Sequence, residues 1–205
     1  MRDIDVRRAV LAEMQRIHGS DPDTLVVEEV GLCQGLARID IAVINGSVHG
    51  YELKSERDTL DRLPAQLGAY SQALEFVTVV AAKKHLAELK TIIPPWWGIW
   101  VASQKGQVMT LTNKRAARPN PQLSALALAQ FLWRDEVLQF LVERRMDSGL
   151  KSKSRQQLWD KLAANATLEE LSDLVRKTLK ARGASWRSAP KQELDGDLHP
   201  LSSMS

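Results

Sequence analysis

Apolar residues recur along the chain with two different spacings, and the order in which these spacings alternate predicts an α/β fold. Apolar positions three and four residues apart predict helices, whereas strict alternation or runs rich in Val and Ile predict strands. A strand, a helix and a further strand in succession predict a crossover with parallel pairing. The first half of the chain is expected to contain a helix over 3–18, strands over 24–30, 36–44 and 47–54, a helix over 60–74 with Pro64 in its first turn, and a strand over 76–82.

The second half of the chain changes from strands to helices after a polar break near residue 118. Thr167 and Glu170 have the spacing of a capping box, which predicts the start of the last helix. Beyond Gly183 the composition turns polar and rich in helix breakers, which predicts a disordered tail. The expected elements are a short helix over 83–91, strands over 98–103 and 107–112, and helices over 122–133, 135–146, 154–164 and 168–182.

The two strands 36–44 and 47–54 contain the residues that point most directly to chemistry. Asp40 lies in the middle of the first strand, and Glu52 and Lys54 share one face at the end of the second. Ionised groups are costly inside a sheet unless something compensates them, so two carboxylates at one spot need a cation. A hard divalent ion with oxygen ligands is the usual one, and we expect it between Asp40 and Glu52.

This shared site depends on the turn that joins the two strands. A two-residue turn at Asn45-Gly46, the strongest hairpin signal in the chain, would place Asp40 and Glu52 on opposite faces. A three-residue loop, or a bulge that slips the pairing by one residue, would bring them onto the same face. Gly46 and Gly50 permit either feature, and we predict one of them.

Asp40 and the later Glu52-Leu53-Lys54 resemble the D-x(n)-(D/E)-x-K signature of the PD-(D/E)xK nuclease superfamily, although Ile39 stands where a proline often precedes the first acid. The expected order of helix, three strands, helix and strand resembles the superfamily's common core. Residues 26–80, PPWWG and LWRDE are also similar to a small family of bacterial proteins within it, and the resemblance covers about residues 2–145. It implies an α/β fold with a restriction-endonuclease-like core.

The resemblance also implies roles for the motif residues. Asp40 and Glu52 would bind Mg²⁺ or Mn²⁺ together with the backbone carbonyl of Leu53, and the metal would activate a water for attack on a phosphodiester. Lys54 would position that water or help to deprotonate it. The implied activity is that of a metal-dependent nuclease acting on DNA, in repair, restriction or mobile-element biology.

Further residues are candidates for supporting the same site. An additional acid is expected from Glu29, in preference to Glu28 or Glu13, because Glu28 and Glu29 should face opposite ways along a strand. Ordinary surface acids are the equal alternative for all three. Gln66 and Tyr70 lie one helical turn apart and can reach one site, where Gln66 is the better candidate for contacting a phosphate. Tyr70 is expected to be a core aromatic residue with its hydroxyl hydrogen-bonded.

An alternative function stays open beside the nuclease. A module with the same fold could bind nucleic acid, or act as a regulator, without cleaving it. The three intact motif residues favour the enzyme, because a binding module has no need to keep all of them. A homodimer is a possible assembly for such an enzyme. A single site cuts both strands of a duplex only if two copies of the chain pair or if one copy acts twice.

The net charge of +3 and the isoelectric point of about 9.1 are only mildly basic and do not identify a partner. The distribution of the charge along the chain says more. The segment 151–187 contains nine bases and four acids, an excess of +5 that is larger than that of the whole chain. Such a surface attracts phosphates, which makes nucleic acid, and DNA first, the expected partner. A solvated helical face is the plainer alternative, and the helix pair 154–182 also admits a helix-turn-helix interpretation.

The remaining features point to an ordinary protein of the cytoplasm. Cys33 is the single cysteine, and neither a long apolar run nor a secretory leader is visible. Trp96, Trp97 and Trp100 could stack on bases, but burial under the C-terminal helices is favoured. His49 is expected to be exposed beside the hairpin turn, and Trp133 and Trp159 are expected in the core. The chain is thus expected to divide into residues 1–118 as a nuclease-like core, 119–183 as a helical extension and 184–205 as the tail.

Overall fold

The computed structural model describes residues 1–106, 108–146, 148–150 and 152–183, so the expected tail lies outside the described residues. The elements are α1 (Asp3–His18), β1 (Leu25–Leu32), η1 (Cys33–Gly35), β2 (Ala37–Ile44), β3 (Val48–Lys54), α2 (Leu63–Ala73), β4 (Phe76–Ala82), η2 (Lys83–His85), α3 (Leu86–Ile92), β5 (Gly98–Lys105), β6 (Val108–Arg115), α4 (Ala125–Ala129), α5 (Arg134–Glu143), α6 (Arg155–Asn165) and α7 (Leu168–Arg182).

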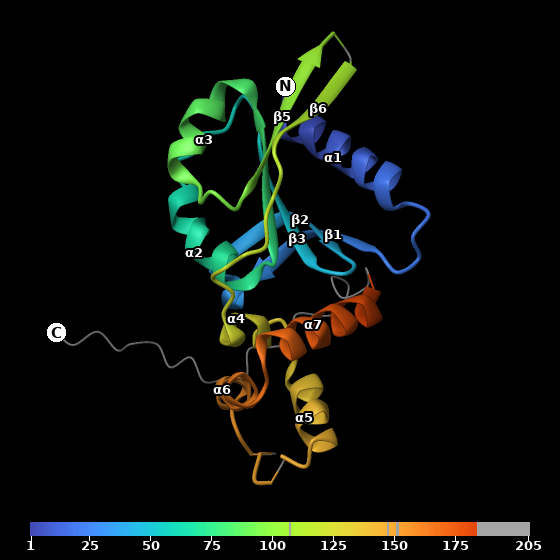
Figure 1. Cartoon of the computed structure of the whole chain (residues 1–205), viewed down its shortest axis with the longest axis vertical. Helices are drawn as coiled ribbons and strands as arrows, with labels where there is room; N and C mark the ends of the chain where they lie inside the picture. Colours follow the sequence, from blue (N-terminus) through green and yellow to red (C-terminus); the bar gives the residue numbers. More distant parts are fainter. Residues whose placement is uncertain (107, 147, 151, 184–205) are drawn as a thin grey trace, which may run out of the picture.

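Six strands form one mixed sheet, which confirms the α/β fold. The strands lie in chain order from β1 to β6. β4 pairs in parallel with β3 and with β5, and the other neighbours are antiparallel. The predicted crossover is therefore confirmed, because α2 connects β3 to β4, and α3 makes the second crossover, from β4 to β5 (Figure 1).

Helices cover both faces of the sheet, and one face carries more of them than the other (Figure 1). On one face lies α1, whose buried Val6, Val10 and Met14 pack against Ile41 and Leu53 of the sheet. The other face carries α2 and α3, and α4 to α7 extend the same hydrophobic cluster below it. The helical extension and this face of the sheet therefore share one core.

The predicted helix over 122–133 is shorter in the structure. It is limited to α4, and Trp133 caps the following helix instead of continuing this one, because its N–H donates to the Glu136 carboxylate at 2.6 Å. Trp133 is consequently 38% exposed, so its expected place in the core was wrong. Trp159 is buried as expected, and its indole N–H donates to the Leu132 carbonyl at 3.0 Å.

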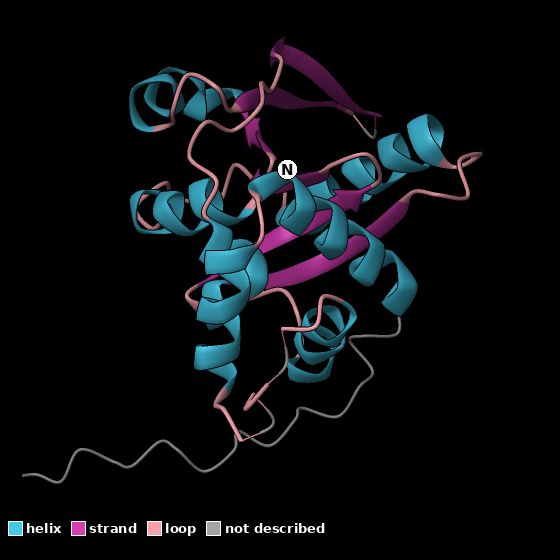
Figure 2. Cartoon of the chain, turned by 60° about the horizontal axis from the view of Figure 1, so that its bottom comes forward, coloured by secondary structure: helices cyan, strands magenta, loops and turns pink. Residues whose placement is uncertain are grey.

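The last two strands are longer than predicted. The outer ends of β5 and β6 project past the helices at the top of Figure 1, and Figure 2 shows the same strands at the top of the view. Trp96 and Trp97, just before β5, are buried, which favours packing over base stacking for this pair. Trp100 packs on the face covered by α1 and not under the C-terminal helices, which corrects its expected location.

In the part of the chain that the structure describes, no helix combines the length and the apolar character that crossing a bilayer requires.

Candidate carboxylate site

The hairpin between β2 and β3 has the three-residue loop that a shared site requires. Ile44 pairs with Val48, which leaves residues 45–47 as the loop, and the ladder continues to the pair Ile41 and Tyr51. The next step in this register puts Asp40 opposite Glu52. The register prediction is therefore confirmed.

Gly50 serves the hairpin by close packing and not by forming a bulge. A Cβ atom at this position would lie 2.6 Å from the Leu74 side chain and 3.0 Å from that of Ile39. A side chain here would have to displace the ends of the Leu74 and Ile39 side chains, which fill the space above Gly50.

The Asp40 carboxylate takes over the hydrogen bonding where the β2–β3 ladder ends. Its Oδ2 atom accepts the backbone N–H of Leu53 at 2.8 Å. Its Oδ1 atom accepts a hydrogen bond from Nη2 of Arg7 at 2.8 Å, and Nη1 of the same guanidinium lies 3.3 Å from the Asp40 carbonyl. Both side-chain oxygens of Asp40 therefore bind groups of the chain itself.

Glu28 and Glu29 both reach Arg7, although alternation along a strand predicts that they face opposite ways. Glu28 Oε2 lies 3.2 Å from Nη1 of Arg7, and Glu29 Oε1 lies 2.9 Å from Nη2. The alternation fails because Glu29 has φ of +59°, which twists β1 at this residue. The expectation of opposite faces was wrong, and Glu29 is near Asp40 as the partner of an arginine.

Arg7 thus joins four carboxylates from three elements. Besides Glu28, Glu29 and Asp40 it lies 3.6 Å from Asp3, one helical turn earlier in α1. Its side chain is only 15% exposed. Burial works to lower the pKa of Arg7, but the surrounding carboxylates, Asp40 first, outweigh it, so the pKa is raised and the guanidinium stays charged. The compensating cation at this spot is an arginine of the chain.

The Glu52 carboxylate is buried and also has partners on both oxygens. Oε1 lies 2.7 Å from Nζ of Lys54, and Oε2 lies 2.7 Å from the Tyr70 hydroxyl. The same hydroxyl lies 2.8 Å from the Arg38 carbonyl and accepts from Nε2 of Gln66 at 3.0 Å. Tyr70 is a buried aromatic residue with its hydroxyl hydrogen-bonded, as predicted, and Gln66 reaches the site through it.

Burial and neighbouring charges shift the acidity of this site. Burial, followed by the nearby Glu52 carboxylate, raises the pKa of Asp40 to about 6, while the Leu53 N–H and Arg7 act in the opposite direction. Burial and the same Glu52 carboxylate raise the pKa of Tyr70, so its hydroxyl keeps its proton as a donor. Asp40 therefore changes charge close to neutral pH.

A divalent ion does not fit this arrangement without rearrangement. All four carboxylate oxygens of Asp40 and Glu52 accept hydrogen bonds from groups of the chain, and Arg7 and Lys54 already supply positive charge. Among the described residues, no group of three or more His, Cys, Asp or Glu side chains is placed to hold a metal ion. Magnesium stays a prediction from the sequence.

Comparison with known proteins gives the family. The model of the family described as "Bacteriophage P4 protein cII" matches residues 2–193. The chain belongs to the bacteriophage P4 protein cII family. It is 22% identical over 182 residues to "Protein cII" of Enterobacteria phage P4, an alignment that covers 89% of this chain and 68% of the relative. No solved structure matches the chain.

This membership overturns the assignment to the PD-(D/E)xK superfamily and the predicted DNA-cleaving activity. One family of another kind accounts for nearly the whole chain, including the segment around Asp40 and Glu52 from which the resemblance was drawn. The physical reason for the error is that an acid, an acid and a lysine at strand ends also satisfy a purely internal network. In this cII-family protein Lys54 neutralises Glu52, and Arg7 neutralises Asp40.

The sequence interpretation missed Arg7, and a signal for it was present. Arg7 directly follows the buried Val6, so it lies at the edge of the apolar stripe of α1. A base in that position needs a carboxylate on the sheet beneath it. Glu13, one of the candidate acids, instead binds Arg16 on the same helix at 2.7 Å and takes no part in the site.

His49 was also misjudged, because it is half-buried and not exposed. Its ring stacks on Tyr51 with centroids 4.3 Å apart, and Nε2 lies 2.9 Å from the Thr78 hydroxyl. Burial, with a smaller contribution from His18, lowers the pKa of His49 to about 4, so the ring is neutral at physiological pH. This polar group lies on the α1 face of the sheet.

The basic segment 151–187 is less available than its composition suggests. Arg176 binds Glu75 and Asp173, Lys180 binds Asp23 at 2.7 Å, and Arg182 binds Glu136. Lys151 and Arg187 lie outside the described residues. The plainer expectation, that these bases belong to a helical surface with local partners, describes α7 better than a free recognition helix does.

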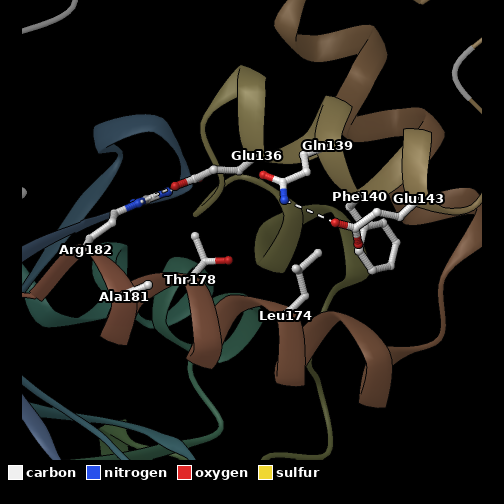
Figure 3. Close-up of a pocket in the computed structure, with 8 residues that line it drawn as sticks. All are labelled: Glu136, Gln139, Phe140, Glu143, Leu174, Thr178, Ala181 and Arg182. Atoms are coloured by element: carbon white, nitrogen blue, oxygen red, sulfur yellow. Dashed lines mark hydrogen bonds and ion pairs between the residues drawn. The ribbon is translucent and has the colours of Figure 1, made fainter.

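A cavity of about 350 Å³ opens between α5 and α7 of the helical extension (Figure 3). Phe140 and Leu174 give it apolar walls, and Arg182, whose guanidinium lies 4.0 Å from the centre of the Trp133 ring, closes one end with Glu136. Gln139 and Glu143 are hydrogen-bonded to each other at 3.1 Å on the rim. This cavity is separate from the carboxylate site on the sheet.

Proposed function

We propose that this member of the bacteriophage P4 protein cII family is a module that binds nucleic acid without cleaving it and acts as a regulator by occupying that nucleic acid. The observation that carries the proposal is the contact between Arg7 and Asp40, at 2.8 Å. Metal-dependent cleavage needs carboxylate oxygens that are free to hold a cation. Here a guanidinium, which cannot activate water, occupies that role.

The fold supports the same proposal. The order of helix, three antiparallel strands, helix and parallel strand is the order expected of a restriction-endonuclease-like core. We infer that the chain uses this arrangement as a scaffold, and that the residues at the ends of β2 and β3 form an internal network of charges. A network of buried ion pairs and hydrogen bonds such as this one stabilises one geometry of the scaffold, although Oε1 of Gln66 is buried without a hydrogen-bond partner among the described residues.

Nucleic acid is the proposed partner because unpaired positive charge remains after the internal ion pairs are formed. Arg8, Lys84, Lys105, Lys114 and Arg118 are exposed and make no ion pair with any residue that the structure describes. Neutralising phosphates with such side chains releases counterions, which drives binding to nucleic acid of any sequence. A cytoplasmic location, where nucleic acid is accessible, belongs to the proposal.

The test is an incubation of the full chain with end-labelled duplex and single-stranded DNA in buffers containing Mg²⁺ or Mn²⁺. Fluorescence anisotropy measures binding, and a denaturing gel of the same samples measures cleavage. We expect salt-dependent binding and intact DNA. Cleavage that disappears in Glu52→Gln, prepared in parallel to exclude a contaminating nuclease, would overturn the proposal, as would a lack of binding at low salt.

A further inference from the structure

We propose that the outer ends of β5 and β6, residues 103–106 and 108–114, form the surface that enters the major groove of duplex DNA. This inference rests on the proposed function and names the part of the molecule that performs it. We call these residues the ribbon. The shape of the ribbon, its charge and its hydrogen-bonding groups support the proposal.

The ribbon has the shape of a probe that stands away from the body. Its strands pair from Ser103 with Thr110 to Lys105 with Val108. Helix α1 packs against the face that carries Met109 and Leu111, and Ser103, Lys105 and Thr110 are exposed. The end of the hairpin projects past the helices at the top of Figure 1. The B-DNA major groove is about 12 Å wide and admits a two-stranded ribbon, whose strands lie about 4.8 Å apart.

The ribbon lies in the longest stretch of the chain without an acid. No Asp or Glu occurs between Glu88 and Asp135 in the sequence. Lys105 at the tip and Lys114 near the base of the ribbon are exposed, and neither pairs with an acid among the described residues. The ribbon itself therefore carries positive charge and no carboxylate, although Asp5 of α1 lies beside Gln104 and Met109 with Arg8. Its exposed lysines are complementary to phosphates on both sides of a groove.

Arg115 holds the base of the ribbon in place while keeping its charge there. Its Nε donates to the Trp97 carbonyl at 2.7 Å, and Nη2 donates to the Pro94 carbonyl at 3.1 Å. Carbonyl acceptors leave the positive charge uncompensated. Arg118, three residues later, is exposed and extends the positive charge beyond the end of β6.

The polar side chains of the ribbon suit a nucleic acid better than a protein partner. Ser103, Thr110, Thr112 and Asn113 are exposed, and each can donate a hydrogen bond to a phosphate oxygen or a base edge. The exposed apolar exception is Val108, at the tip, where a methyl group can contact thymine. The deep, narrow major groove of A-form RNA would not admit the ribbon, so duplex DNA is the expected ligand.

The competing surface is α7, and its charges argue against it. Arg176, Lys180 and Arg182 are engaged by acids from other elements, so binding DNA there would require breaking ion pairs within the fold. Lys161 and Lys177 on α6 and α7 are exposed and unpaired among the described residues. These two lysines provide a matched control for Lys105 and Lys114.

The experiment compares two double variants of the full chain, Lys105→Gln with Lys114→Gln and Lys161→Gln with Lys177→Gln. Both lower the net charge equally, and thermal melts check that both fold. The probe is a fluorescein-labelled duplex DNA of about two helical turns, titrated by anisotropy between about 50 and 200 mM salt. We expect the ribbon variant to lose at least about tenfold in affinity at low salt, and its salt slope to fall by about two. The control should stay within about twofold of the wild type.

Two outcomes would overturn the inference alone: equal losses in the two variants, or a ribbon variant that binds like the wild type. Equal binding of duplex RNA would overturn its groove assignment. If the wild-type chain bound no nucleic acid at any salt concentration, the proposed function would fail and the inference with it.

A second experiment on the wild-type chain distinguishes the ribbon from α6 and α7 without any substitution. Acetylation of lysines in the free chain and in the DNA complex, followed by mass spectrometry, should show protection of Lys105 and Lys114 and none of Lys161 and Lys177. Protection confined to Lys161 and Lys177 would overturn the inference.

Discussion

Nη2 of Arg7 lies 2.8 Å from Oδ1 of Asp40, so a helix that packs across the sheet supplies the positive charge for an acid in the middle of β2. The same guanidinium binds Glu28 and Glu29. The Asp40 carboxylate, the least exposed of the three, would be costly without a cation, and the three carboxylates together would repel one another. Arg7 therefore couples the docking of α1 to the local geometry of β1 and β2.

Removing this charge should raise the pKa of Asp40. In Arg7→Gln the carboxylates keep their burial and mutual repulsion but lose the cation, so the pKa of Asp40 should rise above its value of about 6. Carboxyl ¹³C NMR of labelled aspartate measures it directly. Arg8→Gln, an exposed neighbour on the same helix, should leave it at about 6. A lower value in Arg7→Gln would contradict the assignment of Arg7 as the compensating charge.

The same substitution should lower the free energy of unfolding by about 2 kcal/mol at neutral pH, because hydrogen bonds to charged groups are among the stronger ones. Chemical denaturation of Arg7→Gln and wild type measures the difference. It should shrink as the pH falls through about 6, where Asp40 takes up a proton and no longer needs the cation. A difference that grows on acidification would contradict this account.

His49 and Asp40 should produce opposite dependences of stability on pH. The folded pKa of His49, about 4, lies below its unfolded value of 6.5, so the stability tied to its neutral ring is lost as the pH falls from 6.5 to 4. The folded pKa of Asp40, about 6, lies above its unfolded value of 3.8, so its contribution increases as the pH falls through the same range.

The free energy of unfolding of His49→Gln, measured relative to wild type, should therefore rise by on the order of 3 kcal/mol as the pH falls from 6.5 to 4. For Asp40→Asn, the free energy of unfolding relative to wild type should fall over the same pH range. Denaturation curves at several pH values measure both, and slopes of the same sign in the two variants would show that one of the groups has been assigned wrongly.

Tyr70→Phe should cost about 1–2 kcal/mol of stability, since it removes the hydroxyl shared by the Glu52 carboxylate and the Arg38 carbonyl. Tyr51→Phe is the matched control, because the Tyr51 hydroxyl reaches only the His49 ring, at 3.4 Å. Urea denaturation should rank the two losses in that order. An equal or larger loss in Tyr51→Phe would mean that the hydrogen bond to Glu52 contributes little.

Much of the fold could be predicted from the sequence because local patterns encode it. Periodicity predicted α1 and β4 with their observed ends. The need for Asp40 and Glu52 to share a face predicted a three-residue loop or a bulge, and the structure has the loop. The capping box at Thr167 and Glu170 marked the start of α7 correctly. Each of these features depends on residues close together in the chain.

The site could be predicted only in part, because its partners come from distant elements. Asp40, Glu52 and Lys54 do lie together, and Gln66 and Tyr70 do reach Glu52. What they form depends on Arg7, which lies 33 residues before Asp40. Its place at the edge of the apolar stripe of α1 indicates that it needs a carboxylate, but does not identify Asp40 as that partner. The positive φ at Glu29 likewise follows from tertiary packing. The motif of acid, acid and lysine therefore indicated where the charged cluster lies, but not that the charges of the cluster pair with one another.

The most direct test of the central claim, that Arg7 and Lys54 serve in place of a metal, is an electron paramagnetic resonance titration of Mn²⁺ into the full wild-type chain. The account predicts that the signal of free Mn²⁺ stays undiminished at concentrations where metal-dependent nucleases are saturated. Uptake of one Mn²⁺ per chain, lost in Glu52→Gln, would contradict it.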